Sequence, residues 1–579
     1  MAAAATRVPD RGWNRPRRGI ALALNDHVNA SRRALLRGAS LLTVSWPLPA
    51  RSAPTRLNVR DHGARGDGKA KDTAAIQAAI DAASPGSVVL FPSGDYLSGT
   101  LRLRSRIGLQ LAAGATLIAS PNDADFDPHE KLDYETFTDR ETTDFSFALL
   151  QGRGLDHVTI SGPGRIDGNR RSRGGPKPLA LKQCHHITIR DLTLENAPNY
   201  NISLLGCDHV DISGVIIRNG YSDGIDPDCC RHVRITGCRV ESRDDAICLK
   251  ASLALGAPRS TENVLVTDCD LVNVRNGLKI GTESSGGFRH IVFRNCTLSG
   301  RAEIRQPPPF DIRPFPSAGV SIQNVDGGRL EQVVVSGITM RNVRAPIFVR
   351  LGERGWGQNV RAAGQLTKIK ISDVVATGAE WTSSIMGIPG HDVSDVTLSN
   401  IHLSGKGGGD PALVSRPVKQ RKREYPDAAR FRNLPAHGLY CRHVTRLRVE
   451  RAELTVDAPD PRPALILDDV RDVVVKSLAA SAPAGAAPVV WLRSVQDCLL
   501  DDIRSPQATT LARLSGPESA RVRVAADADP AQLVVIDPDV DSTALRASGS
   551  VTPTRLTSLP NEERGVATAS PSPHLPEAN

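Results

Sequence analysis

A short motif recurs every 23 residues in the first half of the chain and restricts the folds that the sequence can adopt. It consists of a polar residue, an alternating apolar strand, a turn and a second short apolar strand. It appears as HHITIRDLTLENA from residue 185, DHVDISGVIIRNG from residue 208 and RHVRITGCRVESR from residue 231, with looser copies from residues 262, 289, 394, 445 and 471. A period in the twenties with short strands and no room for a helix predicts an all-β solenoid, a single-stranded right-handed parallel β-helix. Leucine-rich repeats share this period, but their Leu/Asn framework is missing.

The start of the chain's folded part predicts a cap for this solenoid. Asp72 is followed by an apolar face of Ile76, Ile80 and Ala83, so we expect a short helix with Asp72 as its N-cap. Strand-like segments follow at residues 87–92 and 109–111. A helix in this place would cover the exposed end of the stack, which would otherwise invite edge pairing.

Three cysteines follow the same period. Cys184, Cys207 and Cys230 are 23 residues apart, so stacked coils would place them one above another. The column is either a disulfide or metal site or a ladder of small buried thiols, and we favour the ladder because no zinc-ligand spacing is present.

The charge of the chain is concentrated at its N-terminus. The formal net charge is +9, and residues 1–53 hold nine Arg and two Asp, which leaves only +2 for the remainder. The segment from Ser31 to Arg37 has a twin-arginine pattern followed by a short apolar run, which predicts an export signal; a basic disordered tail is the alternative. We therefore expect an exported protein with residues 1–53 as signal, a single β-helix domain at 54–555 and a disordered tail at 556–579.

The remaining composition argues against several partners. The basic run at 419–423 is interpreted as a solvated loop, so no nucleic-acid footprint is predicted, and no segment is long and apolar enough to span a membrane. We expect a monomer. The long excursion between Lys406 and Cys441 either helps to wall a cleft or merely insulates the stack.

Three carboxylates stand out in the stretch from Tyr221 to Gly281. Parallel stacking of its short strands would place Asp223, Asp245 and Asn276 in one outward-facing column, with Asp244 one residue ahead. Acid/base hydrolysis of a glycosidic bond requires carboxyl groups close together on an accessible face, and this cluster would provide them.

A second column holds Asp226, Cys248 and Lys279. For Asp226 we weigh pairing with Lys279 or capping of the turn against a catalytic role. Lys279 and Lys250 are either solvated residues of the outer face or ligands for the substrate.

The sequence resembles glycoside hydrolase family 28, the polygalacturonase and rhamnogalacturonase group, from about Leu57 to Leu454. The segments that carry the resemblance are FPSGDYLSGTLRLRS (91–105), GPGRIDGN (162–169), NAPNYNISLLGCDHV (196–210), SDGIDPD, RDDAICLK and NGLKIGT. The resemblance implies an inverting hydrolase of pectin-type polysaccharides, with Asp244 as general acid and with Asp223 and Asp245 activating water. Inversion typically needs carboxyl groups roughly 6.5–9.5 Å apart.

The chain departs from the family pattern at two places. Asn276 stands where the family has the histidine of Gly-His-Gly, and Ser321-Ile322-Gln323 stands where it has Arg-Ile-Lys. An acidic sugar without these cations gives up a charge-assisted contact worth about 1.5–3 kcal/mol. The predicted substrate-binding residues are Asp226, Lys250, Asn276, Lys279 and Gln323, and neither a metal nor a cofactor is expected. The alternatives are a polysaccharide lyase on the same fold and a non-catalytic carbohydrate-binding β-helix.

Overall fold

A computed structural model describes residues 54–143, 145–273, 275–300, 316–485, 487–526, 533–549 and 552–557. The predicted export signal at 1–53 and residues 558–579 of the predicted tail lie outside the described residues. No helix in the described ranges is both long and apolar enough to cross a bilayer.

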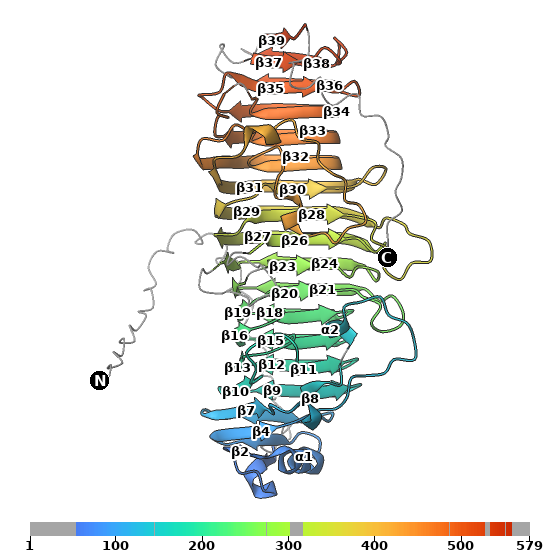
Figure 1. Cartoon of the computed structure of the whole chain (residues 1–579), viewed down its shortest axis with the longest axis vertical. Coiled ribbons are helices and arrows are strands. Elements are labelled where there is room, and N and C mark those ends of the chain that lie inside the picture. Colours follow the sequence, from blue (N-terminus) through green and yellow to red (C-terminus); the bar gives the residue numbers. More distant parts are fainter. Residues whose placement is uncertain are drawn as a thin grey trace, which may run out of the picture. The chain divides into compact units, whose positions relative to one another are not determined.

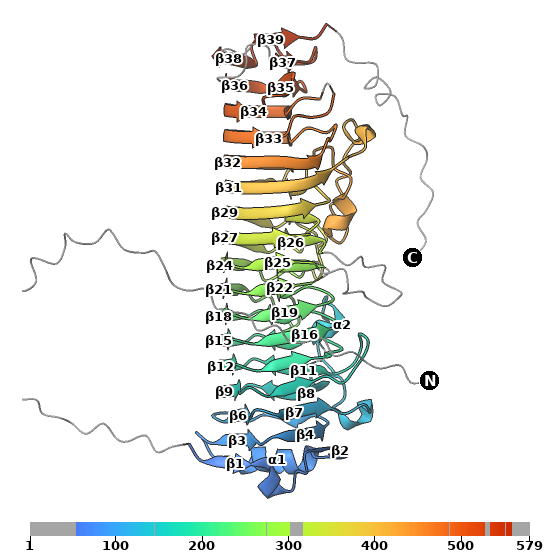
Figure 2. The ribbon, with the colours of Figure 1, turned by 90° about the vertical axis from the view of Figure 1, so that its left-hand side faces the viewer.

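The described chain is a parallel β-helix whose coils stack along one axis (Figures 1 and 2). Each complete coil in the lower half has three strands, and each strand pairs in parallel with its equivalent one coil later, as Ile212 does with Ile235 across 23 residues. Three parallel sheets result. The 23-residue sequence period is therefore the length of one coil, and the predicted all-β solenoid is confirmed.

The first sheet carries the candidate site and consists of short strands. They are β5 (Leu101–Arg102), β8 (Ala148–Arg153), β11 (Lys177–Lys182), β14 (Ile202–Leu205), β17 (Ile225–Asp228), β20 (Ile247–Leu249), β23 (Asn276–Ile280), β26 (Ala318–Asn324), β28 (Ala345–Leu351), β30 (Ser383–Met386), β35 (Thr510–Ser515), β37 (Leu533–Ile536) and β39 (Thr552–Arg555).

The second and third sheets complete the coils. The second has β1 (Arg56–Asn58), β3 (Val88–Phe91), β6 (Gly108–Leu111), β9 (Asp156–Ser161), β12 (His185–Arg190), β15 (Asp208–Ser213), β18 (Arg231–Thr236), β21 (Thr261–Thr267), β24 (Phe288–Arg294), β36 (Ala520–Ala526) and β38 (Leu545–Gly549). The third has β2 (Asp67–Lys71), β4 (Gly94–Ser98), β7 (Ala115–Ala119), β10 (Arg165–Asp167), β13 (Thr193–Glu195), β16 (Ile216–Gly220), β19 (Arg239–Ser242), β22 (Asp270–Val272) and β25 (Thr297–Ser299).

In the upper half the strands of neighbouring sheets join into long bent strands. They are β27 (Arg329–Arg341), β29 (Gln365–Ala379), β31 (Val393–Gly407), β32 (Leu439–Ala458), β33 (Leu465–Ala480) and β34 (Val490–Arg504). The short helical elements are α1 (Thr73–Ala82), α2 (Arg140–Thr143), η1 (Val59–His62), η2 (Asp123–Asp125), η3 (Pro411–Leu413) and η4 (Ala428–Phe431).

Inward-facing aliphatic side chains form the core. Ile189, Ile212, Ile235 and Val266 stack in register from coil to coil and are almost fully buried. Alternate strand residues point inward, so each coil adds one such layer. The outward-facing residues of the first sheet are left to form a site.

Helix α1 lies at the N-terminal end of the stack (Figure 1) and buries Ile76, Ala79 and Ile80. The predicted cap is thus present. Asp72 occupies the N-cap position, as predicted, but its side chain makes no capping hydrogen bond to the helix. Its carboxylate accepts hydrogen bonds from the backbone N–H groups of Arg65 (2.7 Å) and Gly66 (2.9 Å) and so holds the preceding loop.

The cysteine column is a ladder of thiols. Cys184, Cys207 and Cys230 are buried and unbridged, and the Sγ of Cys230 accepts a hydrogen bond from the backbone N–H of Cys207 at 3.3 Å. This agrees with the interpretation of small buried residues filling one position of each coil.

Candidate active site

Asp223, Asp244 and Asp245 lie together in the loops that enter β17 and β20. One carboxylate oxygen from each lies within 4.8 Å of the other two. The backbone N–H of Asp245 donates to Asp223 Oδ1 at 3.1 Å, and the backbone N–H of Asn276 donates to Asp245 Oδ1 at 3.0 Å. The predicted column is therefore held by hydrogen bonds from one coil to the next.

The position after Asp223 requires a glycine for steric reasons. A Cβ at Gly224 would lie 2.4 Å from the carbonyl oxygen of Ala246 in the next coil. Only glycine allows the two coils to approach this closely. The Asp-Gly pair therefore brings Asp223 close enough to bond the backbone of Asp245.

Two lysines partner the carboxylates. The Nζ of Lys250 lies 2.5 Å from Asp226 Oδ1 and 3.3 Å from Asp223 Oδ2, and it donates to the Tyr200 hydroxyl at 2.8 Å. The Nζ of Lys279 lies 2.7 Å from Asp245 Oδ2. The prediction that Asp226 pairs with Lys279 is wrong: Lys250 extends back toward the previous coil and takes that carboxylate.

Asn276 reinforces its neighbour in the same column. Its side-chain amide donates to Asp245 Oδ1 at 2.6 Å, in addition to the bond from its backbone. Gln323 is placed differently, since its amide donates to Ser321 Oγ at 2.7 Å and its strand register pairs it with Arg350. The structure thus brings Asn276 to the carboxylates, whereas Gln323 makes no hydrogen bond to them in the described part of the chain.

The three carboxyl groups have different pKa values. Burial, then the charges of Asp223 and Asp245, raise the pKa of Asp244 to about 7 against the opposing charges of Arg173 and Arg275. Burial, with the charge of Asp226, raises the pKa of Asp223 well above its usual range. Burial also acts to raise the pKa of Asp245, but Lys279 and Asn276 outweigh it and leave that pKa lowered.

The residues that cover Asp244 were not predicted from the sequence. Arg173 Nη1 lies 2.5 Å from Asp244 Oδ2, and the same guanidinium binds both oxygens of Glu141 in α2. Ser222 Oγ donates to the same Glu141 carboxylate at 3.4 Å. Loops distant in sequence supply Arg173 and Glu141, and the repeat pattern carries no signal for such contacts.

The excursion after β31 also reaches the site. Tyr425 Oη lies 3.4 Å from Lys279 Nζ, and Asp427 Oδ2 lies 2.6 Å from Arg275 Nη1. Of the two alternatives for this excursion, contact with the site is the one that the structure shows.

A further charged group continues the site on the coil above. Arg354 Nη2 lies 2.6 Å from Asp326 Oδ2 and 3.7 Å from Glu283 Oε1, and all three side chains are buried. Burial and the charge of Glu283 raise the pKa of Asp139, which precedes α2. Acidic groups therefore extend beyond the three predicted aspartates.

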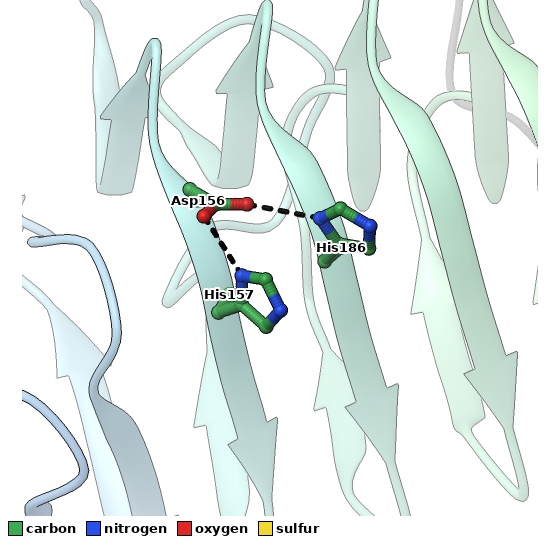
Figure 3. Close-up of side chains that lie close together, drawn as sticks. All are labelled: Asp156, His157 and His186. Atoms are coloured by element: carbon green, nitrogen blue, oxygen red, sulfur yellow. Dashed lines mark hydrogen bonds and ion pairs between the residues drawn. The ribbon is translucent and has the colours of Figure 1, made fainter.

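A separate cluster on the second sheet joins Asp156, His157 and His186 (Figure 3). Asp156 accepts from His186 Nδ1 at 2.9 Å and lies 2.8 Å from His157 Nδ1, which lowers its pKa to about 2. The two rings are stacked at 4.4 Å with planes only 24° apart, and His209 continues the stack. Both Nδ1 atoms are directed at the Asp156 carboxylate, and the rings stack from one strand of the second sheet to the next, so we interpret the cluster as part of a ladder of stacked imidazoles on that sheet.

Comparison with known proteins agrees with this geometry. The chain matches three families: "Rhamnogalacturonase A/epimerase, pectate lyase-like" over residues 56–122, "Glycosyl hydrolases family 28" over residues 91–256 and "Right handed beta helix region" over residues 179–337. The family 28 match includes Asp223, Asp244 and Asp245.

Individual relatives extend the match. A probable polygalacturonase of Vitis vinifera is 26% identical over 66% of this chain and 83% of its own length. An exo-poly-alpha-D-galacturonosidase of Dickeya chrysanthemi is 34% identical, but over only 20% of each chain. The structure of an exopolygalacturonase from Thermotoga maritima is similar in fold, with a TM-score of 0.51, 21% identity and coverage of 60% of this chain and 87% of that one.

The coil stack defines the fold as a right-handed parallel β-helix, and the sequence matches define the class of protein as a glycosidase. Within that class, the resemblance to glycoside hydrolase family 28 is confirmed, and the match to that family over residues 91–256 contains the carboxylate cluster.

Proposed function

We propose that this enzyme hydrolyses glycosidic bonds of a pectin-type polysaccharide, with Asp244 as general acid and Asp245, assisted by Asp223, activating water. One observation carries the proposal: Asp244 and Asp245 are adjacent, yet their pKa values are displaced in opposite directions. Two carboxyl groups whose environments separate their pKa values are suited to the acid and base roles.

The exposure of the side chains supports the same roles. The Asp244 side chain is 19% exposed, whereas those of Asp223 and Asp245 are 6% and 4% exposed. A general acid must reach the leaving oxygen of a bound saccharide. Asp244 is the carboxyl of the cluster that is open to such a contact, and with a pKa of about 7 it keeps its proton in mildly acidic solution.

Asp245 has the surroundings of a base. Lys279 and Asn276 stabilise its ionised form, so it accepts a proton from water while remaining fixed in position. Burial raises the pKa of Asp223, which favours its protonated form, and its Oδ1 accepts the backbone N–H of Asp245. In this proposal Asp223 orients the water and Asp245 removes its proton.

The stereochemical course comes from the family resemblance alone. The nearest oxygens of the three carboxylates lie within 4.8 Å, closer than the roughly 6.5–9.5 Å between carboxyl groups that is typical of inverting enzymes. Proton NMR of the first product anomer tests this step. Inversion is the expected result, and retention would assign one of the buried aspartates as a nucleophile.

The charged residues of the site indicate which sugars it can accept. Lys250 and Lys279 do not replace the missing Arg and Lys freely, because each is already paired with a carboxylate. Arg173 and Arg275 are paired likewise. We therefore expect the cleavage point to tolerate sugars of low charge, and acidic residues of the substrate to be held elsewhere.

The testing experiment compares wild type with Asp244→Asn on polygalacturonate, rhamnogalacturonan and neutral oligosaccharides. We expect the wild-type enzyme to release reducing ends without forming unsaturated products that absorb near 235 nm, and with no loss on addition of a chelator. Unsaturated products would indicate a lyase, and binding without turnover would indicate a carbohydrate-binding protein.

A further inference from the structure

The segment between β31 and β32, residues 408–438, crosses the outer side of the first sheet, and we call it the strap. Arginines of the sheet bind its backbone carbonyl groups: Arg442 Nη1 donates to Val418 at 2.8 Å, Arg493 Nη2 donates to Val414 at 2.9 Å, and Arg350 donates to Gln420. Apolar residues of the strap (Ala428, Phe431, Leu434 and Ala436) pack against Phe348, Tyr440, Ile466 and Trp491. The strap is thus fixed to the β-helix by both polar and apolar contacts.

The strap encloses a cavity of about 310 Å³ with a strongly basic lining. Five cationic residues line it: Arg416, Lys419, Arg421, Arg430 and Arg432. The remaining lining residues are Pro417, Val418, Ala429, Phe431, Asn433 and Leu434. None of the lining residues is acidic. Glu424, which lies outside the lining, pairs with Arg421 at 2.5 Å and with Arg430 at 2.9 Å.

Three of these cations have no carboxylate partner within the described part of the chain: Arg416, Lys419 and Arg432. All three are exposed, so their charge is available to a ligand from solution. Several unneutralised cations around one hollow raise the local concentration of anions and offer charge-assisted hydrogen bonds.

One segment of the strap links the cavity to the candidate active site. Asp427 binds Arg275 through one oxygen, and its other oxygen accepts the backbone N–H of Ala429 at 2.8 Å, where η4 begins. Ala429 and Arg430 line the cavity, while Tyr425 contacts Lys279. The stretch from Tyr425 to Arg430 therefore contacts Lys279 and Arg275 of the candidate site at one end and lines the basic cavity at the other.

We infer that this hollow is a subsite for a carboxylate-bearing sugar unit of the polysaccharide, located away from the bond that is cleaved. Guanidinium groups bind carboxylates with two parallel hydrogen bonds, which suits Arg416 and Arg432 to a uronate. This chain has Ser321 and Gln323 where the family has Arg and Lys. We infer that the cations of the strap bind the acidic sugar instead. The inference rests on the proposed function for the saccharide nature of the ligand.

The test measures binding in the Asp244→Asn background, where a bound oligosaccharide is expected to persist. The probes are a hexamer of galacturonate, a neutral hexasaccharide and inorganic phosphate, titrated by calorimetry at two salt concentrations. The variant is the triple substitution Arg416→Gln, Lys419→Gln and Arg432→Gln. The control neutralises three exposed strand cations away from the strap: Arg341→Gln, Lys370→Gln and Arg523→Gln.

We expect the strap variant to bind the acidic hexamer at least about tenfold more weakly, with little change for the neutral hexasaccharide and none in the control. The salt dependence of the acidic hexamer should also become shallower. Unchanged affinity in the strap variant, an equal loss in the control, or phosphate binding as tight as the hexamer would each overturn the inference.

The same triple substitution in the otherwise wild-type enzyme separates this inference from the proposed function. We expect KM for the acidic polymer to rise while kcat is retained, because the substituted side chains line the cavity, whereas Asp244 is paired with Arg173. Hydrolysis with an unaltered KM would remove the subsite and leave the enzymatic function standing. Absence of hydrolysis by the wild-type enzyme would remove the proposed function, while the binding measurement would still test the subsite.

Discussion

At the scale of single residues, Asp244 and Asp245 show how one dipeptide acquires two protonation states. Asp245 lies in the inter-coil column, where Lys279 and Asn276 bond its oxygens. Asp244 lies one residue earlier and faces Arg173 from another loop. Burial disfavours ionisation of both, and only Asp245 has enough compensation to stay ionised.

Replacing Asp244 with Asn tests its role as the acid. The amide keeps the size of the side chain but has no proton to give to the leaving group. We expect kcat to fall by about 10²–10⁴-fold, the usual contribution of a general acid. Circular dichroism and the melting temperature serve as controls for folding, and an unchanged kcat would contradict the assignment.

Replacing Arg173 with Gln tests the origin of the Asp244 pKa. The guanidinium lowers that pKa, so its removal should raise it above about 7. Since a general acid works while protonated, we expect the alkaline limb of the kcat/KM profile to move to higher pH. A limb that stays in place or moves to lower pH would show that Arg173 does not face the working acid.

The sequence predicted the column of Asp223, Asp245 and Asn276 because its members occupy equivalent positions of a repeat. It did not predict the pairing of Asp226 with Lys250, since a long side chain can reach either neighbouring coil. The contact of Arg173 with Asp244 was also beyond prediction, because irregular loops have no periodicity from which a position can be derived.

At the scale of elements, the coils and the loops differ in how they are specified. Alternating apolar residues define the strands, and a one-residue slip would expose the buried face of a strand, so the sequence fixes both strand and register. The strap has no such pattern. Its position depends on arginine contacts such as that of Arg442 with Val418, formed only after the sheet exists.

Substituting Arg442 with Met should loosen the strap without unfolding the coils. The variant loses the 2.8 Å bond to the Val418 carbonyl, a charged hydrogen bond worth about 1.5–3 kcal/mol. We expect faster amide hydrogen exchange in residues 414–422 and a nearly unchanged melting temperature. Arg446→Met, which removes an exposed ion pair with Asp395, is the control and should leave exchange of the strap unaltered.

At the scale of the whole molecule, the stack depends on repeated burial and carries no cross-links. All ten cysteines of the sequence are buried and free. The predicted solenoid, its N-terminal helix and its thiol ladder followed from periodicity alone. The ligand of each face of the stack could not be predicted from periodicity, because it depends on loops inserted between otherwise equivalent coils.

The absence of disulfides in this described set of cysteines gives a direct prediction. Alkylation under denaturing conditions without reductant should add ten labels to each chain by mass spectrometry. A reductant should leave the melting temperature of the folded protein unchanged. Fewer labels, restored to ten by reduction, would show that a pair of thiols had oxidised.

The backbone bonds from Asp245 to Asp223 and from Asn276 to Asp245 have one more consequence. They tie the separation of Asp223 and Asp245 to the interval between adjacent strands, about 4.8 Å. A side-chain replacement does not change that interval, because the backbone pairing of the sheet sets it. We therefore expect chains related to this one to differ in the ligand they bind through the loops that cover the coils, while the spacing of the carboxylates stays the same.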